Sequence, residues 1–144
     1  MGKKMSKAKR GRRKKSTADI AEAEWTIMKV VWENEPCAAG TVQEILAETK
    51  GWAYGTVKTT MDRMVEKGFL QVEKIRYLQL FRSCISEVEA KRIEFRKMLR
   101  RAFDGALTPM MQFLIEHESL SKEEAEQFYK FVDKAGKRNI KRKK

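Results

Sequence analysis

The chain has 144 residues, with 32 Lys and Arg against 20 Asp and Glu, and its formal net charge is +12. This length suits one compact domain, or a small domain with an interaction appendage, and the positive charge favours an anionic partner. No apolar run approaches the ~18 residues needed to cross a bilayer, and no signal-peptide core follows the basic N-terminus. We therefore expect a cytoplasmic protein.

Residues that carry catalytic or metal chemistry are few and scattered. Cys37 and Cys84 are far apart and form no Cys-x-x-Cys pair, and His117 is the only histidine. Such a set builds neither a disulfide framework nor a common zinc cage, and nothing near His117 pairs a nucleophile with a base. We expect no enzymatic activity, no metal and no cofactor, with both cysteines acting as small apolar residues.

The positive charge is concentrated at the two ends. Residues 1–17 contain nine Lys and Arg, residues 134–144 contain seven, and neither segment contains an acid. Both segments have too much like charge and too little apolar content to fold alone, so we expect solvated arms. They either help to bind a polyanion or merely keep the protein soluble. The body between them is net −4, but its central block, residues 50–101, is +7.

Two short helices are expected at the start of the body. Segment 19–36 has apolar residues at i, i+4, i+7 and i+11, which predicts an amphipathic helix that Pro36 stops. Its expected buried stripe is Ala21, Trp25, Met28 and Trp32. Segment 39–51 predicts a second helix, with Val42, Ile45, Leu46 and Thr49 on its inner side.

A third helix is expected from about Gly55 to Lys67, and it divides into two faces. Its inward residues are Val57, Met61, Met64 and Val65. Gly68 is placed to close the helix in a left-handed conformation, and Phe69 supplies the apolar contact that often follows. The outward face would then carry Tyr54, Thr56, Lys58, Thr59, Asp62 and Arg63. Such a face is either an ordinary solvated surface or one that reaches phosphates and base edges in a DNA major groove.

After Gly68 the apolar period changes from helical to alternating. Residues 69–83 predict a two-stranded ribbon, with Lys74, Ile75 and Arg76 near its bend. Three short helices followed by a hairpin predict a winged helix-turn-helix domain, mostly α with a small β-hairpin. This context, together with the local +7, favours the nucleic-acid interpretation of the third helix, with Lys74 and Arg76 as contacts from the wing.

The same segment resembles the DNA-binding half of the penicillinase repressor family, which includes methicillin-resistance and copper-responsive repressors. The matching signatures are AEWxxMxxxW at Ala23, the pair Gly51-Trp52, TVKTxxxRxxxKG at Thr56 and FxGxL at Phe103. The resemblance covers about Ile20 to Lys134. It implies a dimeric winged-helix repressor on a palindromic operator, with recognition residues Tyr54, Thr56, Lys58, Thr59 and Arg63.

This chain departs from the family pattern at three places. Gly55 stands where the family usually has Ser or Thr, which loosens the start of the third helix. The wing turn EKIRY, residues 73–77, lacks the common Gly-Arg. The Cys-rich C-terminal motif of the copper-responsive branch is also missing, which argues against copper sensing.

Three further helices are expected in a C-terminal region, residues 85–134, that follows the winged domain of residues 18–84. The first runs from Val88 to Phe103 and Gly105 ends it; Thr108 and Pro109 suggest the N-cap and first residue of the next. Ser121 and Glu124 predict a capping box for the last helix. The predicted dimerisation residues are Phe95, Leu99, Phe103, Leu114, Phe128 and Val132.

These helices form too thin a layer to bury themselves, so a second copy of the chain is the expected partner. The alternative is that their apolar stripe folds back onto the winged domain of its own chain. The family resemblance also implies a membrane sensor-protease system that triggers cleavage, here between Gln112 and Phe113, although Gln112 replaces the family's Asn.

The sequence thus predicts a sequence-specific transcriptional repressor that binds double-stranded DNA as a homodimer and is relieved by proteolysis. The rival prediction is a non-specific protein of nucleoid or RNA-binding type that uses its basic arms, with the winged unit as a scaffold.

Overall fold

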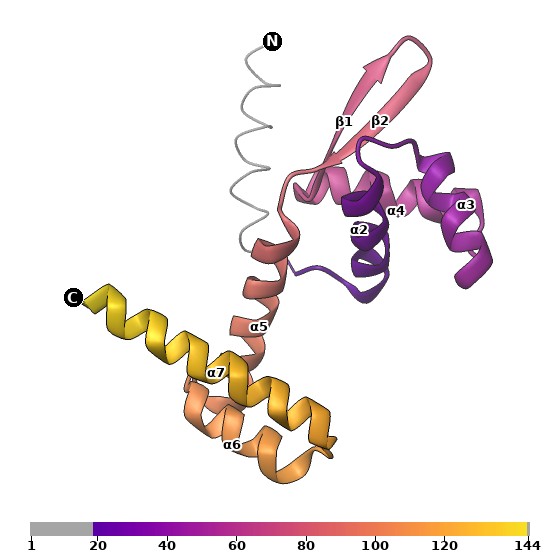
Figure 1. Cartoon of the computed structure of the whole chain (residues 1–144). Coiled ribbons are helices and arrows are strands. Elements are labelled where there is room, and N and C mark those ends of the chain that lie inside the picture. Colours follow the sequence, from indigo (N-terminus) through magenta and orange to yellow (C-terminus); the bar gives the residue numbers. More distant parts are fainter. Residues whose placement is uncertain (1–18, 144) are drawn as a thin grey trace. The chain divides into compact units, whose positions relative to one another are not determined.

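The computed structural model describes residues 19–143, which form two compact units, one ending at Ile93 and the other beginning at Glu94 (Figure 1). The basic arm expected over residues 1–17 lies outside the described residues. The elements confirm a winged helix-turn-helix domain followed by helices.

The first unit contains three helices and a hairpin. The helices are α2 (Glu22–Asn34), α3 (Ala39–Thr49) and α4 (Tyr54–Lys67). Strands β1 (Leu70–Ile75) and β2 (Leu78–Ser83) pair antiparallel, in a register from Leu70↔Ser83 to Ile75↔Leu78. The hairpin extends away from the helices (Figure 1). Cys37, just before α3, adds a short bridge to β2 through two backbone hydrogen bonds with Phe81, of 3.1 and 2.8 Å.

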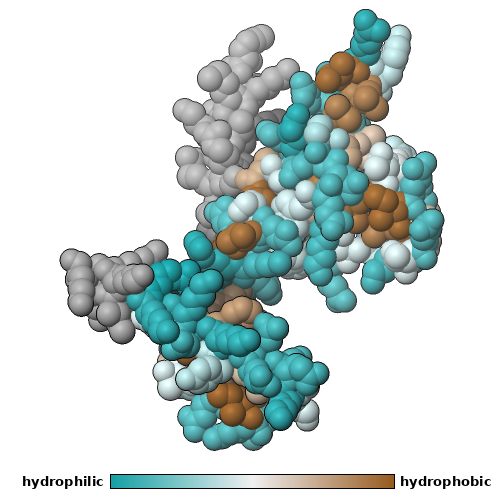
Figure 2. Space-filling model, in the orientation of Figure 1, coloured by the Kyte–Doolittle hydropathy of each residue, from teal (hydrophilic) through white to brown (hydrophobic). Residues whose placement is uncertain are grey.

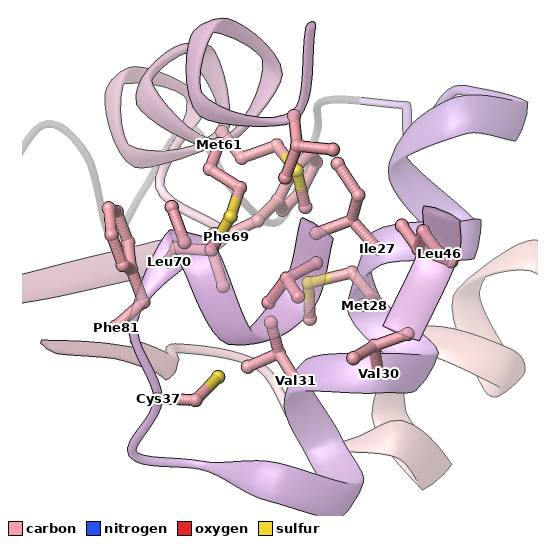
Figure 3. Close-up of a cluster of buried hydrophobic side chains, with 14 of the residues drawn as sticks. Ile27, Met28, Val30, Val31, Cys37, Leu46, Met61, Phe69, Leu70 and Phe81 are labelled. Carbon is pink, nitrogen blue, oxygen red and sulfur yellow. The ribbon is translucent and has the colours of Figure 1, made fainter. Parts of the chain in front are cut away.

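The core of this unit lies where α2, α3 and α4 meet the base of the hairpin. Its completely buried side chains include Ile27, Met28, Val31, Val42, Val57, Met61, Met64, Phe69 and Phe81. Figure 3 shows several of them pointing toward one another, with Met28 and Met61 between the helices. The expected inward face of α4 is confirmed, with Val65 partly buried beside it. Gly68 has φ 90°, and Phe69 N–H donates to Met64 O at 2.9 Å, as the predicted helix end requires.

The predicted inner side of α2 is partly wrong. Ala21 is exposed and Trp25 and Trp32 are only half-buried, whereas Ile27 and Val31 are completely buried. The two indole rings meet edge to face, with centroids 5.9 Å apart, and Trp32 Nε1 donates to Ile85 O at 2.9 Å. A tryptophan needs a partner for its N–H, so it suits the border of a core better than the centre. On α3, Val42 and Leu46 are buried as expected, but Ile45 is 38% exposed and Thr49 is exposed.

An ion pair between a buried carboxylate and a half-buried lysine joins the start of α2 to the end of α4. Glu24 is 2% exposed; its Oε1 accepts from Ala21 N–H at 2.8 Å and its Oε2 lies 2.8 Å from Lys67 Nζ. The carboxylate therefore both caps α2 and fixes the last turn of α4. A buried carboxylate without its cation is costly, so this contact makes the position of α4 depend on Lys67.

Helix α5 (Glu87–Phe103) begins in the first unit and ends in the second. Ile85 and Ala90 are buried in the core, and Ile93 packs partly against it. The compact winged unit therefore extends past Cys84, where sequence reasoning set its boundary. The cysteines agree with their expected apolar role, since Cys37 is buried and Cys84 is half-buried. Burial, and secondarily the charge of Glu35, raises the pKa of Cys37.

The second unit contains the end of α5, α6 (Leu107–His117) and α7 (Lys122–Lys143). The predicted start of α6 at Thr108 is wrong, because Ala106 is the N-cap. Pro109 still lies in the first turn, where its missing N–H is not needed. The Ser121–Glu124 capping box is confirmed by two reciprocal hydrogen bonds of 3.0 Å. No helix within residues 19–143 combines the length and apolar content needed to cross a bilayer.

Residues 134–144 were expected to form a solvated arm that does not fold alone, and the structure shows that helix α7 continues through them as far as Lys143. At the start of this segment, Lys137 Nζ lies 3.3 Å from Asp133 Oδ2, one helical turn earlier. Cations near a helix C-terminus also interact favourably with the helix dipole. Like charge alone therefore does not end a helix that has already been started by its capping box.

Lys67→Met tests the Glu24 contact. We expect the free energy of unfolding to fall by roughly 2 kcal/mol, less than for a fully enclosed pair because the Lys67 side chain is partly in water. Urea unfolding followed by circular dichroism measures the loss. The matched control is Lys91→Met, which breaks the exposed 3.0 Å pair with Glu87 and should cost about 0.5 kcal/mol or less. Equal losses in the two variants would contradict the assigned role of Glu24.

Candidate nucleic-acid interface

Helix α4 presents a polar face opposite its buried methionines. Tyr54 is 51% exposed, Lys58 is half-buried, and the remaining residues of the face, Thr56, Thr59, Asp62 and Arg63, are exposed. The burial of Val57, Met61 and Met64 fixes the rotation of the helix and so decides which side chains reach water. The sequence prediction of which side points outward is confirmed.

The three threonines of α4 do not share one role. Thr60 is 8% exposed, and its Oγ1 donates to Thr56 O at 2.8 Å, so its hydroxyl is satisfied within the helix. Thr56 and Thr59 carry their hydroxyls on the exposed face. Only these two can offer a short polar group to a partner.

Lys58 is engaged inside its own helix. Its Nζ lies 3.0 and 2.9 Å from the two carboxylate oxygens of Asp62, one turn further along. Sequence analysis placed both residues on the outward face but missed their pairing, although the i, i+4 spacing gives the signal. Exposed pairs of this kind stabilise a helix by only ~0.3 to 0.5 kcal/mol, so a phosphate can replace the Asp62 carboxylate at small cost.

The start of α4 is positioned by α3 and by the core. Gln43 Nε2 donates to Trp52 O at 3.2 Å, and the Trp52 side chain packs partly against the core. Ala53 is the N-cap and makes no side-chain hydrogen bond, and Val57 N–H donates to its carbonyl at 3.2 Å. Through this contact α3 fixes the segment that immediately precedes α4, and with it the position of the first outward residues of α4.

The hairpin and α4 contribute to one shared hollow of about 310 Å³. Tyr54 and Lys58 line it from α4, and Lys74 and Tyr77 line it from the hairpin. Its other lining residues are Ala38, Ala39 and Gly40 at the start of α3, and Leu78, Gln79 and Phe81 on β2. Two lysines and two tyrosines therefore converge on one surface. Thr56, Thr59 and Arg63 are not part of the hollow, since they lie further round the exposed face of α4.

The wing residues differ in how the structure places them. Lys74 and Arg76 are both exposed, but Arg76 lies in the turn, with φ 59°, and does not line the hollow. Tyr77, the neighbouring turn residue, does line it, and sequence analysis did not select it as a site residue. The exposure of an aromatic residue at a turn cannot be read from the alternation of the two strands.

The predicted dimerisation residues are exposed to different degrees. Phe128 and Val132 are 40% and 51% exposed, Phe95 is 38% exposed, and Phe103 and Leu114 are half-buried. Leu99 is only 4% exposed, so its side chain is already covered within the chain. On α6 and α7, the exposed apolar residues that sequence analysis did not select as site residues are Leu107, Met111, Ile115, Tyr129 and Phe131.

The predicted cleavage pair lies within α6. Gln112 is exposed, and its Nε2 donates to Glu116 Oε2 at 3.1 Å. Phe113 is 48% exposed; its ring contacts those of Phe103 and His117, at centroid distances of 5.6 and 4.7 Å. No residue of α6 is buried, so little apolar packing holds this helix in place.

A helix with an exposed polar face, positioned by a second helix and flanked by a basic hairpin, is the arrangement with which winged helix-turn-helix domains bind DNA. The fold and this surface therefore define a DNA-binding protein of the winged-helix class.

Comparison with known proteins gives the family. Residues 20–134 match the sequence profile described as penicillinase repressor, and the chain belongs to this family. The methicillin resistance regulatory protein MecI of Staphylococcus aureus (strain N315) is 25% identical over 118 residues, which are 82% of this chain and 96% of that protein. The penicillinase repressor of Bacillus licheniformis is 27% identical over 119 residues, 83% of this chain and 93% of that protein.

Among solved structures, the DNA-binding domain of the repressor BlaI is 28% identical to this chain, covers 49% of it and 85% of that domain, with a TM-score of 0.45. The predicted family resemblance is thus confirmed, and family membership makes the chain a DNA-binding transcriptional repressor.

Proposed function

We propose that the protein represses transcription as a homodimer on a palindromic operator, with α4 lying in the major groove of each half-site. The observation that carries this proposal is the rotation of α4, which buries Val57, Met61 and Met64 and leaves its lysine, threonines and arginine outward. A major groove admits a helix, and hydroxyl, ammonium and guanidinium groups donate to phosphates and base edges.

Within this surface the residues have different roles. Thr56, Thr59 and Arg63 lie on the part of α4 away from the hollow and are proposed to meet base edges. Tyr54, Lys58 and Lys74 surround the hollow and are proposed to contact the phosphate backbone, with Arg76 reaching DNA from the turn. Phosphate contacts fix register, whereas base contacts give sequence preference.

The second unit supports the homodimer. Its α6 and α7 leave six large apolar side chains at least 48% exposed, namely Leu107, Phe113, Ile115, Tyr129, Phe131 and Val132. Figure 2 shows apolar atoms at the surface of this unit. Burying a large apolar side chain stabilises by ~1.5 to 3 kcal/mol, so the set can offset an association cost of ~4 to 15 kcal/mol.

A two-fold dimer would also account for operator recognition. Two copies of α4 related by a two-fold axis present the same residues to two half-sites, and a spacing of ~34 Å matches one DNA turn. We therefore propose a palindromic operator rather than a single asymmetric site.

We further propose that proteolysis relieves repression, by cleavage between Gln112 and Phe113 after a membrane sensor-protease system responds to its signal. The exposed Gln112 and the absence of buried residues in α6 support this proposal, because weakly packed helices open locally at low cost. Cleavage would separate α7 from the DNA-reading unit and remove much of the apolar surface available for pairing.

The first test separates base reading from general attraction. Thr59→Ala and Arg63→Ala should weaken binding to an operator by about ten-fold or more per site, and binding to random DNA much less. Deleting residues 1–15 should instead weaken binding to all sequences and flatten its salt dependence. Titrations at several salt concentrations measure both effects. Thr49→Ala, an exposed threonine at the end of α3, is the control.

The same titrations also test the rival function, non-specific binding of nucleic acid by the basic arms. If the α4 variants and the arm deletion have one common, sequence-independent effect, the protein is a non-specific binder that uses its basic arms. Structured RNA that competes as well as the operator would point the same way.

Val132→Asp tests the homodimer. A carboxylate placed at an apolar contact should weaken self-association by more than ten-fold, with a parallel loss of operator affinity. Sedimentation velocity over a concentration series measures the change. Val88→Asp is the matched control, because Val88 is 66% exposed on the part of α5 that belongs to the first unit. Equal sedimentation of both variants and the wild type would refute this dimer surface.

Cleavage is tested in cells that contain the sensor-protease system. After induction, mass spectrometry should find an N-terminal fragment that ends at Gln112, and the operator should be released. Intact protein in induced cells, with transcription restored, would rule out proteolytic relief.

A further inference from the structure

Helix α7 changes the sign of its charge along its length. Residues 122–133 hold four acids and two cations, whereas residues 134–143 hold six cations and no acid. The helix is continuous through both segments (Figure 1). The match to the family profile ends at residue 134, so most of the basic segment lies outside the part of the chain that is shared with the family.

Four exposed cations lie along one side of α7. Lys130, Lys134 and Arg138 are spaced i, i+4 and i+8, and Lys137 lies beside them, next to Arg138. We call these four residues the basic stripe. At ~1.5 Å per residue, the stripe is about 12 Å long. Val132, which is proposed to contact a second copy, lies on the opposite side of the helix, two residues before Lys134.

The basic stripe is poorly neutralised within its own unit. Lys137 has an exposed partner, Asp133 at 3.3 Å, but among residues 19–139 no carboxylate forms an ion pair with Lys130, Lys134 or Arg138. Like charges at i, i+4 destabilise a helix, and the favourable effect of the helix dipole is confined to its last turn. Lys130 and Lys134 lie more than two turns before the end of α7. The stripe therefore opposes the stability of its own helix, and an anionic partner would compensate for this.

Charge and composition identify that partner as double-stranded DNA. A membrane surface fits poorly, because a helix in a bilayer interface buries an apolar face, and residues 134–143 offer only one alanine and one isoleucine for it. DNA carries one negative charge per ~1.7 Å of its axis, so ~12 Å of duplex offers more phosphates than the stripe has cations. The winged unit belongs to a DNA-binding repressor, so the DNA that it holds meets the second unit at a high effective concentration.

We propose that the basic stripe of α7 is a second DNA contact, which binds the phosphate backbone outside the half-sites read by α4. This inference rests on the proposed function, because the winged unit must first hold a duplex. Ammonium and guanidinium groups release counterions from phosphates and carry no preference for sequence. The stripe therefore raises the affinity for operator and random DNA by the same factor and leaves the choice of operator to α4. The phosphates belong either to the flanks of the operator or to a second duplex, and the experiment separates the two.

The experiment uses the full-length chain and a duplex that it enriches from a pool of random sequences. Affinity is measured for this duplex trimmed to its footprint, called the short duplex. It is measured again for a long duplex, which has about two helical turns of unrelated sequence added at each end.

The test variant removes three charges of the stripe and is Lys134→Gln/Lys137→Gln/Arg138→Gln. Glutamine is a good helix former, so α7 should keep its structure. The matched control removes three charges from exposed positions of the second unit outside the stripe and is Arg100→Gln/Arg101→Gln/Lys122→Gln. Circular dichroism checks the fold. The test variant should keep its helix content and melt no earlier than the wild type, because Gln relieves the repulsion between like charges.

For the wild type, the added flanks should raise affinity by about five- to ten-fold at ~150 mM salt, and the test variant should lose this gain. The slope of log Kd against log salt concentration on the long duplex should fall by about two or more, since each phosphate contact contributes ~0.9. The control should keep the gain and the slope. The test variant should also keep its preference for operator over random DNA, which Thr59→Ala lowers.

A gain from the flanks that the test variant loses places the phosphates beside the operator. If the wild type gains nothing from the flanks but binds an additional short duplex when DNA is in excess, and the test variant does not, the phosphates belong to a second duplex. Sedimentation velocity counts the duplexes in each complex.

The inference is overturned if the test variant and the control behave alike, because net charge alone would then account for the effect. It is also overturned if the test variant sediments as a smaller species without DNA, since the stripe would then contact a second copy. A loss of binding to anionic phospholipid vesicles, with DNA binding unchanged, would assign the stripe to a membrane surface instead. Failure to enrich any duplex would overturn the proposed function as well. Enrichment that Thr59→Ala weakens, with no effect of the test variant, would overturn this inference alone.

Discussion

The position of helix α4 depends on one buried charge. Glu24 caps α2 with one carboxylate oxygen and holds the Lys67 ammonium with the other, each at 2.8 Å. These contacts fix the C-terminal end of α4, while Gln43 and Trp52 fix the segment before its start. The methionines between them set the rotation of the helix. Because a buried carboxylate tolerates the loss of its cation poorly, the helix cannot rotate or slide without a penalty.

Packing in the two units follows opposite rules. The winged unit buries most of its large apolar side chains within one chain. Its surface can therefore carry polar side chains, such as those on the outward face of α4. The second unit has Leu99 as its buried hydrophobic residue among those described and leaves most of the large apolar side chains of α6 and α7 exposed. A unit of this kind gains much of its stability from whatever covers it. We proposed that a second copy does so, which would couple DNA binding to the protein's concentration.

Features set by neighbours in the chain were predictable from sequence, and features set by distant contacts were not. Gly68 and Phe69 indicate the end of α4 from the local sequence alone. The spacing of Val57, Met61 and Met64 likewise defines its inner face. The Glu24–Lys67 pair joins residues 43 positions apart, and no local pattern marks it. Trp25 and Trp32 have the spacing of a buried stripe, but their size and the Trp32 N–H keep them at its edge. At the tip of the wing the sequence pointed to Arg76 but not to Tyr77, because strand alternation says nothing about the exposure of an aromatic residue in a turn.

The Lys58–Asp62 pair gives the surface an internal competitor for the phosphate backbone. In the DNA complex proposed above, a phosphate must displace the Asp62 carboxylate before it gains the Lys58 ammonium. Because an exposed pair of this kind is worth only ~0.3 to 0.5 kcal/mol, the exchange lowers the affinity for every duplex slightly and by the same amount, whatever its sequence. Discrimination between sequences must therefore come from the other outward side chains of α4.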